Sequence, residues 1–338
     1  NKIFEINPTP SSLVDKIAVL NKLNRFDEVK ELENINFDFD DEIYYNFAQA
    51  HYKNQDFKRA IELLELALNK NPENKKAMIL LGEVYFSEND LLKSKELFKK
   101  LENETENPVV NSYLGLFKLD EGKYEDAINY FQKAMKLDER NSKYVYNLAN
   151  AYFLNGWMEE AAKFYNIAIC LDADNPDYRY SLAYLYTQTQ EYDKAIKELK
   201  TVLEKEPKHL QARILSAKLS DLKGDPVSAK VALDAIVKEY PKEDYALVEL
   251  AKVCEELSQY DLAKNNMEKA LAINPNSLNY LSDYANILIE MAQYGEAQEV
   301  IEKILKKNEN FINGYILEAK NYLQIKDYLI KEDQWSDN

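Results

Sequence analysis

The sequence is poor in the residues that most enzyme and metal sites require. Its 338 residues include two cysteines, Cys170 and Cys254, and two histidines, His51 and His209. Two cysteines do not make a disulfide framework, and two histidines exclude most histidine-based catalytic and metal sites. The sequence contains no HExxH, GxxxxGK[ST], GxSxG or CxxC motif. We therefore expect a protein that is not an enzyme and that has no catalytic residues, cofactor or metal.

Glycine and proline are also scarce, and acidic residues are in excess over basic ones. Seven glycines and nine prolines argue against collagen, turn-rich β folds and long disordered linkers. No stretch approaches the roughly 18 uninterrupted apolar residues that a transmembrane helix needs. The 59 acidic residues outnumber the 43 lysines and arginines, so the net charge is −16. Such a charge disfavours general binding to nucleic acid and to anionic membranes, and we expect neither a nucleic-acid partner nor membrane insertion.

The chain is rich in self-similarity, with a period of 34 residues and one 33-residue unit at 75–107. Two small-residue positions recur in these units, one in each half. Two helices approach closely only where a side chain is nearly absent, so each unit is predicted to be a helix–turn–helix pair. The first position holds Ala48, Gly82, Gly115, Ala149, Ala183, Ala217, Ala251, Ala285 and Ala319, and the second holds Ala60, Ser94, Ala127, Ala161, Ala195, Ala229, Ala263 and Ala297.

The repeats divide the chain into three parts. Residues 41–311 form eight tandem units, and prolines such as Pro72 and Pro176 separate neighbouring units because proline ends one helix and admits the next. Residues 1–40 are predicted to be a degenerate helical pair with an acidic link. Residues 312–338 are predicted to be a capping helix with a frayed tail, since a solenoid needs a final helix with a polar face.

The chain resembles the tetratricopeptide repeat family. The resemblance rests on the period, the two small positions, a recurring aromatic position and the boundary prolines. The resemblance covers residues 41–311 and implies an all-α fold, a right-handed α-solenoid of tandem helix–turn–helix repeats. In such a fold the first helix of each unit lines a concave inner face. Family members usually hold a peptide or a helix of a partner protein on that face, so the resemblance implies a non-enzymatic scaffold or adaptor.

Residues three and four apart along each first helix are predicted to form the floor of a partner-binding groove. Through the first part of the array these residues are rich in aromatic and amide side chains, which suit a binding surface because aromatic groups offer a large contact area. The predicted groove residues are Tyr45, Gln49, Tyr52, Glu83, Phe86, Leu116, Leu119, Tyr146, Asn147, Asn150, Phe153, Tyr180 and Tyr184. Any single tyrosine among them is equally well explained by packing between repeats.

Further along the chain the corresponding positions become charged. The sequence therefore predicts an inner surface with an aromatic N-terminal half and a charged C-terminal half. The residues at these positions are Lys218, Asp221, Glu249, Lys252, Glu255, Asn286 and Lys320, all of which are charged except Asn286.

Two other functions stay open at this point, and so does self-association. The array could be the targeting arm of a larger enzyme whose catalytic domain lies outside this sequence, or a structural strut of a secretion or envelope assembly. We expect a cytoplasmic location, or an exported or envelope-associated one if a signal peptide precedes Asn1. Cys254 is predicted to be a buried, inert thiol, and His51 a half-buried packing residue.

Overall fold

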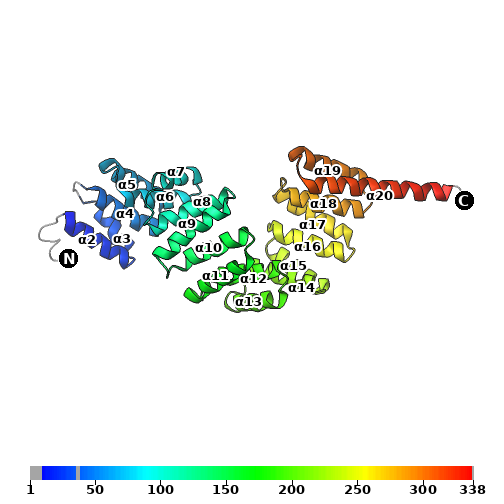
Figure 1. Ribbon diagram of the computed structural model, residues 1–338, viewed down its shortest axis with the longest axis horizontal. Helices are drawn as coiled ribbons and strands as arrows, with labels where there is room; N and C mark the ends of the chain where they lie inside the picture. Colours follow the sequence, from blue (N-terminus) through cyan, green and yellow to red (C-terminus); the bar gives the residue numbers. More distant parts are fainter. Residues whose placement is uncertain (1–9, 36–38, 337–338) are drawn as a thin grey trace. The chain divides into compact units, whose positions relative to one another are not determined.

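The computed structural model describes residues 10–35 and 39–336, and throughout these residues every regular element is a helix. Within each of two compact units, consecutive helices pack against one another in chain order (Figure 1), which confirms the predicted all-α helical-repeat solenoid. The chain forms two compact units, Asn1–Ala173 (unit 1) and Asp174–Asn338 (unit 2). Each unit has its own buried apolar clusters.

In both units, first and second helices alternate as the repeats predict. The helices of unit 1 are α2 (Pro10–Lys22), α3 (Phe26–Leu32), α4 (Asp41–Lys53), α5 (Phe57–Lys70), α6 (Lys75–Ser87), α7 (Leu91–Lys100), α8 (Pro108–Asp120), α9 (Tyr124–Leu137), α10 (Ser142–Leu154) and α11 (Met158–Leu171). Those of unit 2 are α12 (Pro176–Gln188), α13 (Tyr192–Lys205), α14 (Leu210–Leu222), α15 (Pro226–Glu239), α16 (Asp244–Glu256), α17 (Tyr260–Ile273), α18 (Leu278–Glu290), α19 (Tyr294–Lys307) and α20 (Ile312–Ser336).

Local sequence sets where these helices begin and end. Several first helices start after an asparagine whose side chain accepts a hydrogen bond from the first turn, as Asn74 does from the Ala77 amide. Within each repeat, one residue of left-handed backbone separates the first helix from the second, which closes the first helix. This turn position holds Gln55, Asn89, Gly122, Gly156, Gln190, Gly224, Ser258 and Ala292.

The small residue of the first helix lies against a large side chain of the second helix. A Cβ atom added to Gly115 would lie 2.7 Å from the ring of Phe131, and one added to Gly82 would lie 2.6 Å from the ring of Phe98. Both rings are fully buried, so these two repeats have no room for alanine.

The short repeat at 75–107 differs from the others in its second helix. Helix α7 has 10 residues, whereas α5 has 14. Its C-cap residue, Leu101, is buried in the cluster that also contains Phe98 and Phe117. The second helix of this repeat therefore ends about one turn earlier than α5 does.

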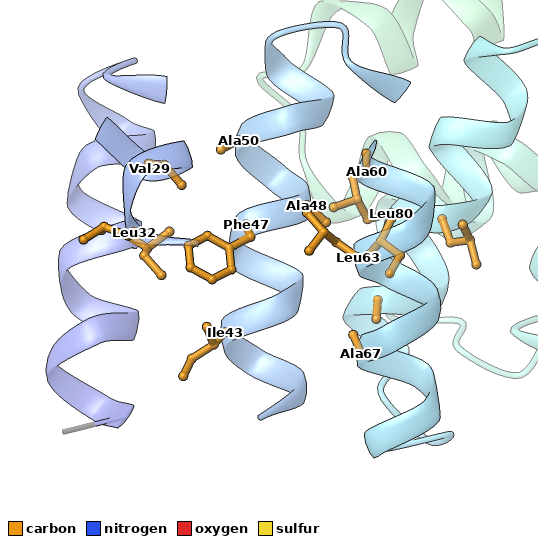
Figure 2. Close-up of a cluster of buried hydrophobic side chains, with 14 of the residues drawn as sticks. Val29, Leu32, Ile43, Phe47, Ala48, Ala50, Ala60, Leu63, Ala67 and Leu80 are labelled. Atoms are coloured by element: carbon orange, nitrogen blue, oxygen red, sulfur yellow. The ribbon is translucent and has the colours of Figure 1, made fainter. Parts of the chain in front are cut away.

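The core of the first repeats is continuous with the two N-terminal helices. Figure 2 shows Phe47 of α4 pointing toward Leu32 of α3, while Ala48 lies on the side of α4 that meets α5. Ile43, Phe47 and Ala48 are completely buried. Helices α2 and α3 thus share the core of the first complete repeat.

A buried charged cluster also ties α3 to this repeat. The His51 imidazole contacts the carboxylate of Glu33 at one ring nitrogen and that of Asp56 at the other, the latter at 2.8 Å, while Arg59 lies 3.1 Å from Glu33. Burial would lower the pKa of His51, but its hydrogen bonds to Glu33 and Asp56 outweigh burial and raise it. The predicted half-buried packing residue is therefore a buried, ion-paired one.

The ends of the chain are described in part. Residues 1–9, 36–38 and 337–338, which belong to the predicted N-terminal pair, the acidic link and the predicted tail, lie outside the described residues. The limits 1–40, 41–311 and 312–338 stay a prediction.

Candidate partner-binding surface

The first helices of unit 1 lie side by side and share one surface. Glu42 of α4 pairs with Lys76 of α6 at 3.6 Å, and Asn147 of α10 donates a hydrogen bond to Ser112 of α8 at 3.5 Å. We call the side of α4, α6, α8 and α10 that carries the predicted residues the first-helix surface of unit 1. These residues are all half-buried: Tyr45, Gln49, Tyr52, Glu83, Phe86, Leu116, Leu119, Tyr146, Asn147, Asn150 and Phe153.

The two remaining predicted residues belong to unit 2. Tyr180 is half-buried and Tyr184 is 36% exposed, both on α12. They lie on the first-helix surface of their own unit.

Aromatic packing beneath the surface holds part of it in place. Tyr113 stacks on Phe98 of α7 with ring centroids 4.4 Å apart, and Phe86 meets Tyr113 edge-on at 5.1 Å. Tyr113 was missed by the sequence prediction, although it lies one repeat before Asn147, which was included. The repeat period was the signal that could have found it.

Tyr146 and Asn150 serve their own repeat as well as the surface. The ring of Tyr146 lies 5.8 Å from that of Tyr165 on α11, and the Tyr165 hydroxyl donates a hydrogen bond of 2.6 Å to Asn150. These two residues therefore pack against the neighbouring helix, which was the alternative to partner binding. Substitutions here would disturb the fold together with the surface.

Glu83 has the most unusual setting on this surface. It is half-buried, and its carboxylate makes no hydrogen bond or ion pair with any residue that the structure describes, while its backbone carbonyl accepts a hydrogen bond from Ser87. Burial raises its pKa to about 7, against the opposing charge of Lys143. Burial also raises the pKa of Tyr45, Tyr113 and Tyr144, and the Glu83 carboxylate adds to each increase. The three tyrosines, from α4, α8 and α10, therefore lie near this carboxylate, and Tyr144 is a second residue that the sequence did not single out.

The first-helix surface of unit 2 is built differently. Its predicted charged residues pair with one another or with neighbouring polar groups, mostly across adjacent first helices, so most of their charge is already compensated. The contacts are Lys218–Glu249 (3.1 Å), Lys252–Asp283 (3.1 Å), Lys320–Asn286 (2.6 Å), Lys320–Glu290 (2.6 Å) and Asn286–Glu255.

Asp221 on α14 lies beside this network. Burial and the neighbouring carboxylates of Glu256 and Glu249 together raise its pKa to about 6.

Candidate catalytic and metal groups are sparse in the described part of the chain. No cluster of three or more histidine, cysteine, aspartate or glutamate side chains there could hold a metal ion. Cys254 is buried, and burial raises the pKa of its thiol, whereas Cys170 is exposed. Among the described helices, none combines the length and apolar character needed to cross a membrane.

Comparison with known proteins agrees with this architecture. A tetratricopeptide repeat family model matches residues 40–112, 188–253 and 255–320, which together make up more than half of the chain. A model of anaphase-promoting complex, cyclosome, subunit 3 matches residues 120–201. A curated relative, the TPR repeat-containing protein MJ1428 of Methanocaldococcus jannaschii, is 25% identical over 114 residues. That match covers 33% of this chain and only 20% of the relative.

Solved structures share the fold at low sequence identity. The APC/C hetero-tetramer Cut9–Hcn1 aligns with a TM-score of 0.61 at 17% identity, over 83% of this chain and 55% of that chain. A tetratricopeptide repeat protein from Parabacteroides merdae aligns with a TM-score of 0.54 at 18% identity, over 84% and 98%. The type IV pilus biogenesis factor PilW gives 0.52 at 16%, over 60% and 94%. The chain belongs to the tetratricopeptide repeat family, a family of protein-interaction scaffolds that typically have no catalytic activity.

Proposed function

We propose that the first-helix surface of unit 1 binds a segment of a partner protein, an extended peptide or a helix, and that the chain acts as a non-enzymatic adaptor. The observation that carries this proposal is the contrast between the two units. Unit 1 presents half-buried aromatic and aliphatic side chains around an uncompensated Glu83. Unit 2 presents charges that mostly pair with one another, as Lys218 and Glu249 do, and Asp221 is an exception.

The energetics favour a modest affinity. Burying one large apolar side chain completely contributes roughly 1.5–3 kcal/mol, and the residues of this surface are already half-buried, so each contributes less. Association costs about 4–15 kcal/mol in lost freedom. Several contacts along α4, α6, α8 and α10 are needed to exceed that cost, and we expect a dissociation constant of micromolar order.

Site-specific photo-crosslinking in the source cells tests this proposal. A benzophenone amino acid at Leu116, half-buried on α8, is expected to crosslink to a partner protein. The same group at Leu92, which is 70% exposed on the second helix α7, serves as the matched control and is expected to give no such product. Crosslinking from position 92 and not from 116 would contradict the proposal. Crosslinking from 116 only to a second copy of the chain would replace the adaptor by a self-assembling strut.

A further inference from the structure

The surroundings of Glu83 narrow down which partner segment this surface takes. A buried or half-buried carboxylate is normally compensated, because leaving its acceptor positions empty costs free energy. Glu83 is half-buried, and its carboxylate makes no hydrogen bond or ion pair among the described residues; the charge of Lys143 acts on it only from a distance. Tyrosines from three different helices lie near it, and the described residues contain no group of three or more histidine, cysteine, aspartate or glutamate side chains that could hold a metal ion.

We propose that Glu83, with Tyr45, Tyr113 and Tyr144 around it, accepts one lysine or arginine side chain of the partner segment. This inference rests on the proposed function, since the basic residue arrives as part of a segment bound to the first-helix surface of unit 1. A carboxylate offers a charge-assisted hydrogen bond to such a group. Aromatic faces attract the same cation through their quadrupole.

Unit 2 contains the same kinds of side chain, but there a lysine of the chain itself takes the place of the partner's basic residue. The ammonium of Lys218 lies 3.1 Å from the buried Glu249 carboxylate and 3.4 Å from the Tyr245 hydroxyl. It also lies 5.8 Å from the centroid of the Tyr245 ring. In unit 2 a lysine, a buried carboxylate and a tyrosine thus contact one another. In the described part of unit 1 no lysine or arginine forms an ion pair with the Glu83 carboxylate.

The charges near Glu83 favour the binding of a positively charged side chain from another protein. Lys143 of α10 is exposed, and its charge is close enough to lower the pKa of Glu83 without forming an ion pair. Glu42 of α4, which pairs with Lys76, adds negative potential beside Tyr45. The net charge of −16 attracts basic segments over longer distances.

The protonation of the Glu83 carboxyl should give the affinity for a basic side chain a measurable pH dependence. Because burial raises the pKa of Glu83 to about 7, the carboxyl is partly protonated at neutral pH. A bound cation favours the ionised form, so the affinity for a basic side chain is expected to increase as the pH rises from about 6 to about 8. A group with this pKa changes its ionised fraction roughly tenfold over that range.

The experiment uses the full chain and fluorescent, end-capped decapeptide pools. Each pool fixes one central residue, lysine, arginine or the neutral isostere norleucine, and randomises the rest among neutral residues. At about 150 mM salt, where distant charges are screened, we expect the lysine and arginine pools to bind about tenfold more tightly than the norleucine pool. Glu83→Gln is expected to abolish this preference and its pH dependence while keeping norleucine-pool binding.

Glu96→Gln is the matched control, because Glu96 is an exposed carboxylate on α7 of the same unit and its loss changes the net charge equally. It is expected to keep the preference. A thermal melt of Glu83→Gln should show no loss of stability, since the substitution removes an uncompensated charge. Equal binding of all pools to the wild type, or a preference that survives Glu83→Gln, would overturn the inference and leave the peptide-binding surface in place. Binding of no pool would overturn the proposed function, and this inference with it.

Discussion

Replacing His51 by glutamine is expected to destabilise unit 1 by about 2–3 kcal/mol. Removing one member of a buried ion pair leaves the other charge uncompensated, which costs about 3–5 kcal/mol when burial is complete. The cost is lower here because Glu33 keeps its contact with Arg59 and is 13% exposed. Hydrogen exchange of the α3 and α4 amides, together with a thermal melt, measures the loss.

The same substitution is expected to change how stability depends on pH. His51 has a raised pKa in the folded chain, so its contribution is fully present below its ordinary value of 6.5 and is lost as the pH rises through the raised value. Glu33 has a lowered pKa, because its hydrogen bonds to His51 and Arg59 outweigh burial. Its contribution is present above its ordinary value and is lost as the pH falls through the lowered one.

In the wild type, protection of α3 and α4 should therefore decrease when the pH rises from about 6.5 into the alkaline range. In His51→Gln this decrease should be absent. His209→Gln, in unit 2, is the control, because His209 is the other histidine of the chain. An unchanged pH dependence in His51→Gln would show that the cluster does not stabilise the N-terminal helices.

Replacing Gly115 by alanine is expected to cost about 1–3 kcal/mol, the usual range for overpacking a core. The new methyl group would lie 2.7 Å from the ring of Phe131, which is fully buried and cannot move into solvent. Urea unfolding followed by circular dichroism measures the change. Stability equal to that of the wild type would mean that the repeat can repack around the extra methyl group.

A second substitution provides the control for this prediction. Leu64 and Leu199 hold the position of Phe131 in repeats whose small residue is alanine. Gly115→Ala with Phe131→Leu is therefore expected to be more stable than the sum of the two single effects implies, because the smaller side chain removes the clash. Strict additivity would contradict the proposed contact between these two positions.

The repeat period predicted the fold well because each helix depends on residues close to it in sequence. The small residues, the boundary prolines and the turn positions recur at fixed spacing, so they set the helices one repeat at a time. Tyr45 and Leu116 are half-buried, and periodicity along one helix determines which side of it is covered. Their role in partner binding stays a prediction.

Contacts between repeats could not be predicted in the same way. The ion pair of His51 and Glu33 joins a repeat to the degenerate N-terminal pair, where no periodic neighbour marks the partner. The proximity of Tyr144 to Glu83, two repeats away, depends on how successive helices are rotated, and the period carries no information about rotation. The hydrogen bond between Tyr165 and Asn150 likewise depends on a side-chain reach that spacing does not reveal.

The central claim is that unit 1 and not unit 2 provides the partner-binding surface. The most direct test is hydrogen–deuterium exchange of the full chain with and without a saturating peptide, selected from a random capped library for affinity to the chain. We predict slower exchange in α4, α6, α8 and α10, with α14, α16 and α18 unchanged. Slower exchange confined to α14, α16 and α18 would contradict the account, because it would place the partner on the surface whose charges already pair with one another.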